Sequence, residues 1–438
     1  MPLKVLLVNP WIYDFAAYNM WSTPLGLYKT AEYLSQFDVH LRYIDCLESY
    51  KPKRYGDGRY LSERVERPPS LAKISRHYKR YGISIEDFKS RLQGSLPIDL
   101  VLVTSVMAYW YPGVQKVIKI IKETIGKIPT ILGGLYPKLY PDHALLFSGA
   151  DAVCVGNVEG SSGVTLQSFG FRLRKLSRDP QPYYKMGLNT HAYAPIQTST
   201  GCPYRCSYCA SYLLDGPYRG RDIDAVLMEI ESLIEQGITD IAFYDDALLY
   251  DADNHIKPIL REVIKRPMSV RFHTPNGLHA RFIDEEVAYL MKQANFKTLR
   301  IGFETVNTTR QVETGGKTGT QEFIDALNRL KNAGFQGHEI GVYLMYGLPG
   351  QGLKEVKEGV EFLKSFKVLV KLAEFSPIRG TKAWEELVRL GVITDDLDPI
   401  LTNNSVFTEL FSPISLQELR RLKLDVKDYN KALLSFWS

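Results

Sequence analysis

Three cysteines, Cys202, Cys206 and Cys209, stand close together in the stretch TGCPYRCSYCA. A structural zinc site normally has four ligands, commonly paired C-x2-C units or histidines at short range. No fourth cysteine is nearby, and the nearest histidine, His191, precedes the stretch. Thiolates are the usual ligands of a four-iron cluster, and three of them would leave one iron open to bind a substrate or cofactor. The spacing therefore favours an iron–sulfur cluster over zinc.

The elements that must position these cysteines lie in residues 195–380, where strand and helix patterns alternate. Strands are expected at 196–200, 240–244, 269–273, 298–303, 339–346 and 372–375, with helices at 223–236, 254–265, 284–294, 321–333 and 354–366. Gly237 and Gly334 follow two of the helices, as C-terminal caps do. Six such strands predict a full or partial (β/α) barrel, whose active residues lie at the carboxyl ends of the strands. The cysteines follow the first strand, at that end.

Residues 1–160 predict a separate α/β domain with a Rossmann-like parallel sheet. Short apolar strands are expected at 4–9, 39–44, 100–105, 130–132 and 152–155, with helices at 24–35 and 114–124. Such folds bind ligands at the carboxyl ends of their strands. The candidate residues there are Asn9, Ser105, Gly133, Gly134 and Gly156. We expect a linker at 161–194 and a small, mostly helical C-terminal region at 381–438.

The composition, with 45% hydrophobic and 24% charged residues and a net charge of +5, is typical of a soluble globular protein. No apolar run approaches the roughly 18 residues of a membrane span, and the N-terminus has no signal-peptide layout. We therefore expect a cytoplasmic protein without a transmembrane segment. Residues 51–80 contain ten Lys and Arg against three acidic residues. This basic insertion could hold an anion, but a solvated surface is the simpler interpretation, and nucleic acid is not an expected partner.

The pattern C-x3-C-x-aromatic-C, with Tyr208 as the aromatic residue, resembles the signature of the radical S-adenosylmethionine (SAM) superfamily. The resemblance implies a partial (β/α)6 barrel and a [4Fe–4S] cluster on the three cysteines, with SAM chelating the open iron. It also implies reductive cleavage of SAM to methionine and a 5′-deoxyadenosyl radical. The electron would come from an external one-electron reductant of the flavodoxin or ferredoxin type.

Further stretches resemble the SAM-binding positions of that family. Asp245 and Asp246 stand where the family holds the SAM amino group, which needs an acceptor, although Asp246 could instead cap a helix. Glu304 resembles the residue that bonds the ribose, and strand alternation predicts Arg300 on the same face. The other candidates are Asn276 and Arg281 after the third strand, which could also be solvated loop residues, Gly347 in the turn after the fifth strand, and Pro377 after the sixth.

The N-terminal domain, with the stretches NPW, TPLGLYKTAEYL, VTSVMAYWY and LGGLYP, resembles the cobalamin-binding class of the superfamily. Many members are methyltransferases in which methylcobalamin supplies the methyl group, and others use the domain differently. Two features depart from the pattern: the D-x-H-x-x-G motif is absent, and the acidic turn reads GNVE at 156–159. We expect Trp11, Trp110 and Tyr111 either to line the corrin pocket or to fill it.

Three hypotheses follow. The resemblance favours a cobalamin-dependent radical SAM methyltransferase. The alternatives are a radical SAM enzyme without functional cobalamin, catalysing a rearrangement, cyclisation or oxidation, and a non-enzymatic iron–sulfur or zinc-binding module. Only Cys46 and Cys154 remain outside the cluster motif, so we expect a single cluster and no sulfur insertion. The expected substrate is a small or lipid-like molecule, and the motifs do not identify the catalytic residues.

Overall fold

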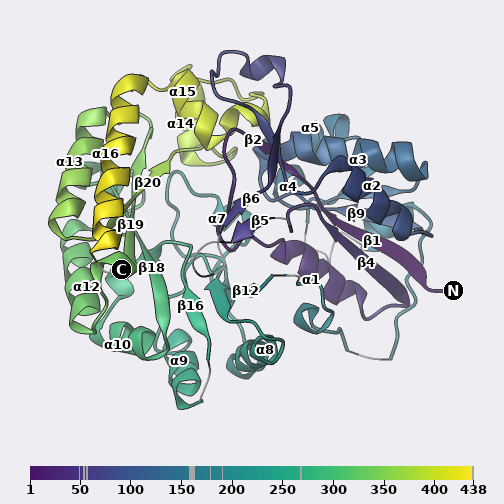
Figure 1. Ribbon diagram of the computed structural model, residues 1–438, viewed down its shortest axis with the longest axis horizontal. Helices are drawn as coiled ribbons and strands as arrows, with labels where there is room; N and C mark the ends of the chain where they lie inside the picture. Colours follow the sequence, from purple (N-terminus) through teal and green to yellow (C-terminus); the bar gives the residue numbers. More distant parts are fainter. Residues whose placement is uncertain are drawn as a thin grey trace. The chain divides into compact units, whose positions relative to one another are not determined.

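The computed structural model describes residues 1–436 except 49, 53, 54, 56, 57, 157–162, 178, 190, 267 and 268. The chain divides into two compact units (Figure 1). The first comprises Met1–His191 and Leu397–Asn403, and the second comprises Ala192–Asp396 and Asn404–Ser438. Most of the expected linker at 161–194 thus belongs to the first unit. The segment Leu397–Asn403 of the expected C-terminal region belongs to it as well. The predicted domain boundaries stay a prediction. The GNVE turn lies outside the described residues except for Gly156.

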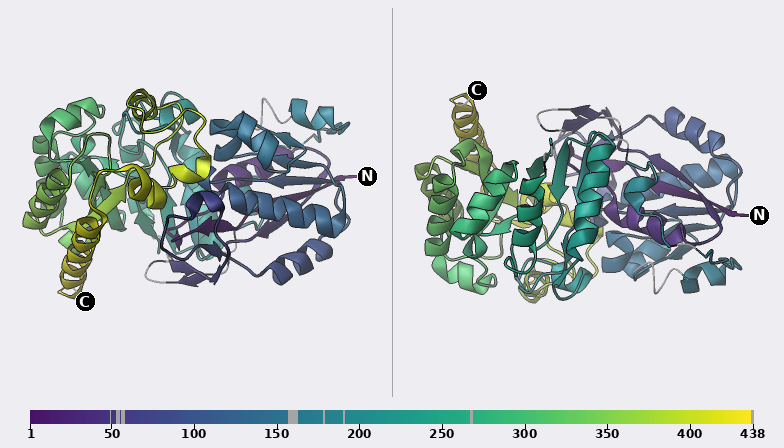
Figure 2. Two further views of the ribbon diagram at one scale, coloured as in Figure 1. Left: turned by 90° about the horizontal axis from the view of Figure 1, so that it is seen from above. Right: turned by 90° about the horizontal axis from the view of Figure 1, so that it is seen from below.

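A five-stranded parallel sheet forms the centre of the first unit and confirms the predicted fold class. Its spatial order is β11 (Ala152–Val153), β10 (Thr130–Leu132), β9 (Leu100–Val103), β1 (Leu3–Asn9) and β4 (Val39–Asp45). All neighbouring pairs are parallel. The central strands are largely buried because helices lie on both sides of the sheet (Figure 2). The chain order reverses between β1 and β9, and such a switch point is where doubly wound sheets bind ligands.

Five helices follow these strands. They are α1 (Leu25–Leu34), α2 (Ile85–Gly94), α3 (Tyr111–Ile125), α4 (Leu135–Leu139) and α5 (Pro141–Phe147). The predicted helices at 24–35 and 114–124 correspond to α1 and α3. Helix α2 was missed, although its start has a local signal: the side chain of Ser84 accepts a hydrogen bond from the Asp87 amide at 3.0 Å, and the first turn is acidic. A short helix, α6 (Gly163–Ser168), follows β11.

Two small antiparallel sheets, which the sequence analysis did not predict, join the basic insertion to the loop after β1. One contains β2 (Ile12–Asp14), β8 (Lys79–Tyr81) and β7 (Ser62–Arg64), and the other β3 (Tyr18–Asn19), β6 (Gly58–Tyr60) and β5 (Tyr50–Pro52). Several of the arginines lie over aromatic rings. The guanidinium of Arg76 is 4.9 Å from the centre of the Phe15 ring, and that of Arg80 is 5.2 Å from Trp11. Part of the basic segment is therefore folded against the domain.

The segment Leu397–Asn403 is anchored in the first unit by the buried carboxylate of Asp14. Asp14 accepts hydrogen bonds from Asn403 Nδ2 at 2.9 Å and from Trp110 Nε1 at 2.8 Å. A second link joins the hydroxyl of Tyr111 to Asp398, at 3.3 Å. Burial raises the pKa of Asp14 while these donors lower it, and burial is the larger effect.

The second unit is a parallel barrel with the six predicted strands in chain order. They are β12 (Tyr193–Ile196), β15 (Asp240–Phe243), β16 (Arg271–His273), β18 (Phe296–Glu304), β19 (Ile340–Tyr346) and β20 (Leu369–Glu374), and a short strand, β17 (Leu278–His279), also pairs with β18. Among the described strands, β12 and β20 end the order without pairing with each other, so the barrel is partial. The first strand ends at Ile196, earlier than predicted.

Helices cover the outside of the barrel sheet (Figure 1). The predicted helices are α8 (Ile223–Glu235), α9 (Ile256–Lys265), α10 (Glu285–Gln293), α12 (Thr320–Asn332) and α13 (Leu353–Ser365). Gly237 and Gly334 have φ of 86° and 96°, which confirms them as the left-handed residues that end helices. Two short helices were not predicted from the sequence: α7 (Ser211–Leu214), which follows the cysteines, and α11 (Thr308–Glu313), which lies between β18 and α12.

Three further helices, α14 (Lys382–Arg389), α15 (Asn404–Phe411) and α16 (Leu416–Ser435), complete the second unit. Helix α16 packs against the edge strand β20, where Asn430 accepts from the amide of Val370 at 2.9 Å and donates to its carbonyl at 2.7 Å. Asn430 therefore takes the place of a neighbouring strand at this edge. None of the helices among the described residues combines the length and apolar character needed to cross a membrane.

Candidate functional site

The three cysteines lie on the loop that leaves the first barrel strand. After β12, residues Ser199–Thr200 form β13, which pairs with β14 (Arg219–Gly220) and ties down both ends of the loop. Gly201 has φ of 74°, and a Cβ there would lie 2.4 Å from the carbonyl oxygen of Pro217. The loop therefore needs glycine at this position for both conformation and space.

The environment of two of the thiols, Cys202 and Cys206, disfavours the thiolate form. Burial raises the pKa of Cys202, and it raises the pKa of Cys206 to about 11. Within the described part of the chain, no three His, Cys, Asp or Glu side chains are grouped as ligands of a single metal ion. Thiolates that bind different irons of one cluster need not converge on a single point.

A second loop, at 314–317, packs directly on the cysteine loop. The amide of Ser207 donates to the carbonyl oxygen of Thr314 at 3.1 Å. Gly315, with φ of 119°, approaches so closely that a Cβ there would lie 2.9 Å from the Cα of Cys206. This contact brings Lys317 to the site, a residue that the sequence analysis did not single out. The run TGGKTG at 314–319 was the available signal, since adjacent glycines often mark a close backbone approach.

Lys317 forms an ion pair with Glu304. Its Nζ donates to Glu304 Oε1 at 2.7 Å, and both side chains are largely buried. Burial lowers the pKa of Lys317, but the carboxylate of Glu304 and nearby Tyr208 and Cys206 raise it more, so the net pKa is well above its usual value. Nζ also lies 5.9 Å from the centre of the Tyr208 ring. Lys317 is thus a cation held beside the cysteine loop.

The backbone of Glu304 is strained. Its φ is 69°, which is uncommon for a residue other than glycine, and the register between β18 and β19 shifts between Gly302 and Glu304. A Cβ at Gly302 would lie 2.8 Å from both Glu304 Oε1 and Lys317 Nζ. The bulge removes the regular alternation on which the prediction for Arg300 relied. Arg300 is buried, and its Nη1 donates to the carbonyl oxygen of Leu299 at 2.9 Å.

The two adjacent aspartates after β15 have different environments. Asp245 is buried and accepts hydrogen bonds from the backbone amides and hydroxyls of both Thr198 and Ser199, at 2.5–3.1 Å. Asp246 is less buried, and burial followed by the charge of Asp215 raises its pKa to about 6. The charge of Asp246 is one of the influences that raise the pKa of Cys202. Asp245 therefore braces the start of the cysteine loop, whereas Asp246 acts electrostatically on one of its thiols.

Asn276 and Arg281 make contacts within the protein. The amide of Asn276 donates to the carbonyl oxygens of Tyr244 and Asp245, at 3.0 and 3.2 Å. The guanidinium of Arg281 donates to the Tyr204 hydroxyl at 3.1 Å and to the carbonyl oxygen of Gly316 at 2.6 Å. Arg281 therefore connects the cysteine loop to the loop that carries Lys317.

Two turns follow the last barrel strands, as predicted. Gly347 comes directly after β19 with φ of 86°, and a Cβ there would lie 2.9 Å from Thr408 Oγ1. Pro377 is buried after β20. Cys202, Asp246, Glu304, Gly347 and Pro377 thus all lie at the carboxyl ends of barrel strands or in the loops that leave them.

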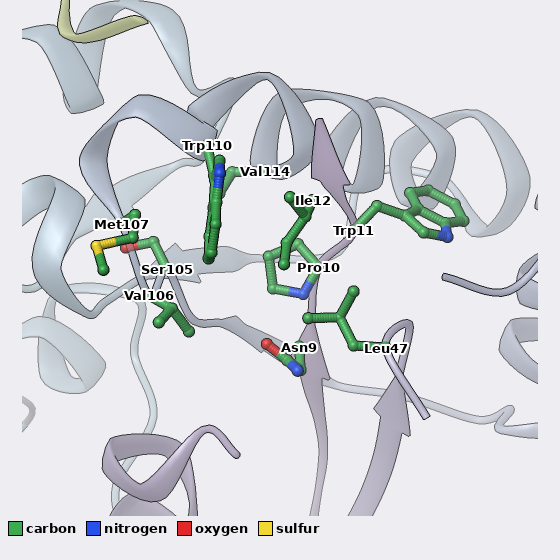
Figure 3. A pocket seen from close by; sticks show the side chains of 10 residues that line it. All are labelled: Asn9, Pro10, Trp11, Ile12, Leu47, Ser105, Val106, Met107, Trp110 and Val114. Carbon is green, nitrogen blue, oxygen red and sulfur yellow. The ribbon is translucent and has the colours of Figure 1, made fainter. Parts of the chain in front are cut away.

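In the first unit, a small hollow with a volume of about 10 Å³ lies at the switch point between β1 and β9 (Figure 3). Asn9, Ser105 and Trp110 are among the residues that line it. The side-chain oxygen of Asn9 is buried without a hydrogen-bond partner among the described residues, while its Nδ2 donates to Asp45 at 2.8 Å. An orphaned acceptor of this kind suits a ligand that donates a hydrogen bond.

The glycines after β10 shape the neighbouring loop. The hydroxyl of Ser105 donates to the carbonyl oxygen of Gly133 at 2.8 Å, and a Cβ at Gly134 would lie 2.3 Å from the carbonyl oxygen of Ser105. A Cβ at Gly133 would meet no atom within 4 Å. Gly156 is exposed after β11.

The three aromatic residues expected at the corrin pocket have three different positions. Trp11 is turned away from Asn9 and Ser105 (Figure 3) and is buried, with its indole donating to Ile83 at 2.8 Å. Trp110 lines the hollow. Tyr111 stacks on Tyr136, with ring centres 5.5 Å apart. Trp11 and Trp110 therefore both line the hollow, Trp11 with its indole ring buried in the core, and Tyr111 is not among the lining residues.

Comparison with known proteins confirms the resemblance seen in the cysteine motif. The family model of the radical SAM superfamily matches residues 196–363, which include the three cysteines and four of the six barrel strands, β15, β16, β18 and β19, in full. A protein of Pyrococcus horikoshii named an uncharacterized methyltransferase is 30% identical over 215 residues, which are 48% of this chain and 45% of that protein. The ribosomal protein uS12 methylthiotransferase of Clostridium botulinum is 28% identical over 205 residues, or 45% of this chain and 46% of that protein. This chain spans about half the length of the curated relatives it matches.

Solved structures share the fold over a longer stretch. The radical SAM methyltransferase TsrM from Kitasatospora setae, determined with cobalamin and a [4Fe–4S] cluster bound, aligns with 89% of this chain and 75% of its own, at a TM-score of 0.64 and 18% identity. The cobalamin-dependent SAM radical enzyme OxsB aligns with 94% of this chain and 58% of its own, at a TM-score of 0.57 and 13% identity. The two-part α/β architecture is therefore that of these enzymes.

Proposed function

We propose that this chain, whose residues 196–363 match the radical SAM superfamily, holds a [4Fe–4S] cluster on Cys202, Cys206 and Cys209 and cleaves SAM reductively. The observation that carries the proposal is the three-cysteine loop at the carboxyl end of the barrel, packed against a loop that supplies a buried lysine. The buried thiol of Cys206 suits a metal centre, because cationic iron would stabilise the thiolate that burial disfavours. When bound, the cluster supplies the electron that splits SAM into methionine and a 5′-deoxyadenosyl radical.

We assign the SAM contacts to residues around this loop. Asp246 is the better acceptor for the SAM amino group, since the oxygens of Asp245 already bind four donors from Thr198 and Ser199. Glu304 would accept from the ribose hydroxyls, and the backbone of the turn at Gly347 would face the adenine. The other predicted contacts are Tyr208, Arg300 and Pro377, which we keep as contacts, and Asn276 and Arg281, which we now regard as residues that position the loops.

The test is anaerobic reconstitution of the full chain with iron and sulfide, followed by dithionite and SAM. The proposal predicts close to four irons per chain, a broad absorbance near 400 nm and formation of 5′-deoxyadenosine or S-adenosylhomocysteine. A chain that binds zinc but no cluster, or a loaded cluster that leaves SAM intact, would contradict it and favour a binding module.

We further propose that the first unit binds cobalamin and that the enzyme is a methyltransferase. The support is the hollow at the switch point, with the orphaned oxygen of Asn9 and the open space at Gly133, together with the fold shared with TsrM and OxsB. Asn9, Ser105, Gly133, Gly134 and Gly156 would contact the ligand, and when bound it would supply the methyl group. Methyl rather than methylthio transfer is proposed because Cys46 and Cys154 are too few to ligate a second cluster.

A second candidate, a radical SAM enzyme without functional cobalamin, is favoured by one observation. The hollow has a volume of only about 10 Å³, far below the roughly 300–1,000 Å³ usual for ligand pockets. Incubation with hydroxocobalamin, followed by desalting, distinguishes the two. Retained corrinoid absorbance, weakened by Asn9→Ala, supports the methyltransferase, whereas no retention in the wild type supports the second candidate.

The remaining proposals concern partners and location. Cleavage of SAM consumes one electron per event, so an external reductant of the flavodoxin or ferredoxin type is required. Three of the five cysteines stand together in the cluster motif, which fits a reducing cytoplasm better than a disulfide framework. We propose a small or lipid-like organic substrate and no nucleic-acid partner, and we retain the predicted division into an N-terminal domain, a barrel and a helical C-terminal region.

A further inference from the structure

Arg310 on α11 binds the turn that follows β19. Its Nε donates to both carboxylate oxygens of Glu355, at 2.9 and 3.1 Å. Its Nη1 donates to the carbonyl oxygen of Pro349 at 2.9 Å, and its Nη2 to that of Gly350 at 3.1 Å. Arg310 and Glu355 are both largely buried. Every nitrogen of the guanidinium therefore bonds to Glu355 or to the turn at 347–350.

Glu355 extends this network to the end of β18. Its Oε1 also accepts hydrogen bonds from the hydroxyl of Thr305 at 2.5 Å and from the side-chain amide of Gln351, through Nε2, at 3.3 Å. Thr305 directly follows Glu304, the residue assigned to the SAM ribose. One ion pair thus joins the strand end that would meet the ribose to the turn that would meet the adenine.

The other end of α11 reaches the cysteine loop. The hydroxyl of Thr314 donates to the carbonyl oxygen of Arg310 at 2.7 Å, and the carbonyl oxygen of Thr314 accepts from the amide of Ser207. Gly315 then packs on Cys206. Residues 305–317, which we call the α11 bracket, therefore contact the cysteine loop, the end of β18 and the turn after β19.

We infer that Arg310 is a positioning residue for SAM, which holds the turn at 347–350 and the end of β18 in register with the cysteine loop. The inference rests on the proposed function, because that proposal assigns these segments to SAM. The turn contains Gly347 and Gly350 at φ of 86° and 69°, and glycines leave a backbone many alternatives. A charge-assisted hydrogen bond from Nε, shared between both oxygens of Glu355, and two bonds to backbone carbonyls restrict those alternatives before SAM binds. Without them, SAM must order the turn itself, and its affinity falls.

The experiment measures the SAM dissociation constant of the full chain by anaerobic calorimetry after cluster reconstitution. Arg310→Met and Glu355→Gln should weaken SAM binding at least tenfold, and Arg310→Lys should lose less because it keeps one donor group. Iron per chain and the cluster absorbance should match the wild type in all three. The matched control is Arg261→Met on α9, where Arg261 pairs with the exposed Glu286; its SAM affinity should stay within twofold of the wild type.

Two results would overturn the inference. One is SAM affinity within twofold of the wild type in Arg310→Met. The other is a loss of iron in proportion to the loss of SAM binding, which would make the network a support of the cysteine loop alone. If Arg310→Met fails to fold, SAM affinity and iron content are compared with the wild type in Arg310→Lys and Glu355→Gln instead. A wild-type chain that takes up the cluster but binds no SAM would instead contradict the proposed function, so the two failures are distinguishable.

Discussion

The ammonium group of Lys317 lies 2.7 Å from the carboxylate of Glu304, beside the loop that carries the three cysteines. The lysine comes from a glycine-rich loop that packs on Cys206, and the glutamate comes from a strained bulge at the end of β18. The pair joins two loops that are separate in the sequence and leaves a buried cation at the proposed cluster site. Its removal should therefore affect both stability and SAM binding.

Replacing Lys317 by methionine should lower the free energy of unfolding by about 3–5 kcal/mol, because it leaves a largely buried carboxylate without its cation. Adding Glu304→Gln should restore part of the loss, since the double variant has no unpaired charge. Urea unfolding of the full chain, followed by circular dichroism, gives the free energy of unfolding of the wild type, of Lys317→Met, of Glu304→Gln and of the double variant. These four values form a double-mutant cycle. The matched control is Lys354→Met, because Lys354 forms an exposed pair with Glu358 at 3.8 Å; it should change the free energy by less than about 0.5 kcal/mol. Additive effects of the two substitutions would show that the pair is not coupled.

Asp245→Asn and Asp246→Asn should have opposite profiles, although the two residues are adjacent. Asp245→Asn places an amide against the donors of Thr198 and Ser199, so it should lower the melting temperature and reduce cluster loading. Asp246→Asn should load the cluster normally but weaken SAM binding at least tenfold. Melting curves, iron analysis and SAM calorimetry distinguish the two. Equal loss of SAM binding with full iron content in both variants would contradict the assignment.

Acid should destabilise the second unit partly through His279. This residue is buried against the ring of Tyr204, and burial, followed by the charges of Lys317 and Arg281, lowers its pKa to about 3. The unfolded chain binds a proton below its ordinary pKa of about 6.5, whereas the folded chain does not until about pH 3. The contribution of His279 to the free energy of unfolding is therefore complete well above pH 6.5 and is lost as the pH decreases from there toward pH 3. The loss from this one group is about 1.4 kcal/mol at pH 5.5.

Unfolding of the cluster-free full chain at pH 7.5 and 5.5 checks this prediction. His279→Phe should reduce the difference in unfolding free energy between the two pH values by about 1.4 kcal/mol. An unchanged difference would mean that His279 binds its proton equally in the folded and unfolded chains.

Local patterns in the sequence predict much of this fold. Apolar runs mark the strands of both sheets, and Gly237 and Gly334 mark helix ends, because such signals depend on neighbouring residues alone. The cysteine motif predicts the radical SAM resemblance in the same way. The small sheets of the basic insertion were missed because their pairing partners, such as β2 and β8, lie far apart in the sequence.

The site required the tertiary structure. Nothing local distinguishes Asp245 from Asp246; the difference arises because β12 ends at Ile196, which allows Thr198 and Ser199 to bind Asp245. Lys317 and Arg310 act across loops on different strands, so no spacing in the sequence connects them to Glu304 or Glu355. Alternation predicted Arg300 and Glu304 on one face, but the bulge in β18 interrupts that alternation.

The most direct test of the account compares the wild type with Cys206→Ala after anaerobic reconstitution. With dithionite, SAM and measured iron content, the wild type should hold one four-iron cluster per chain and release 5′-deoxyadenosine or S-adenosylhomocysteine. Cys206→Ala should lose both the stable cluster and the product. The control Cys154→Ala, outside the cluster motif, should lose neither. Product formation by Cys206→Ala, or a fully loaded wild-type cluster that never cleaves SAM, would contradict the account.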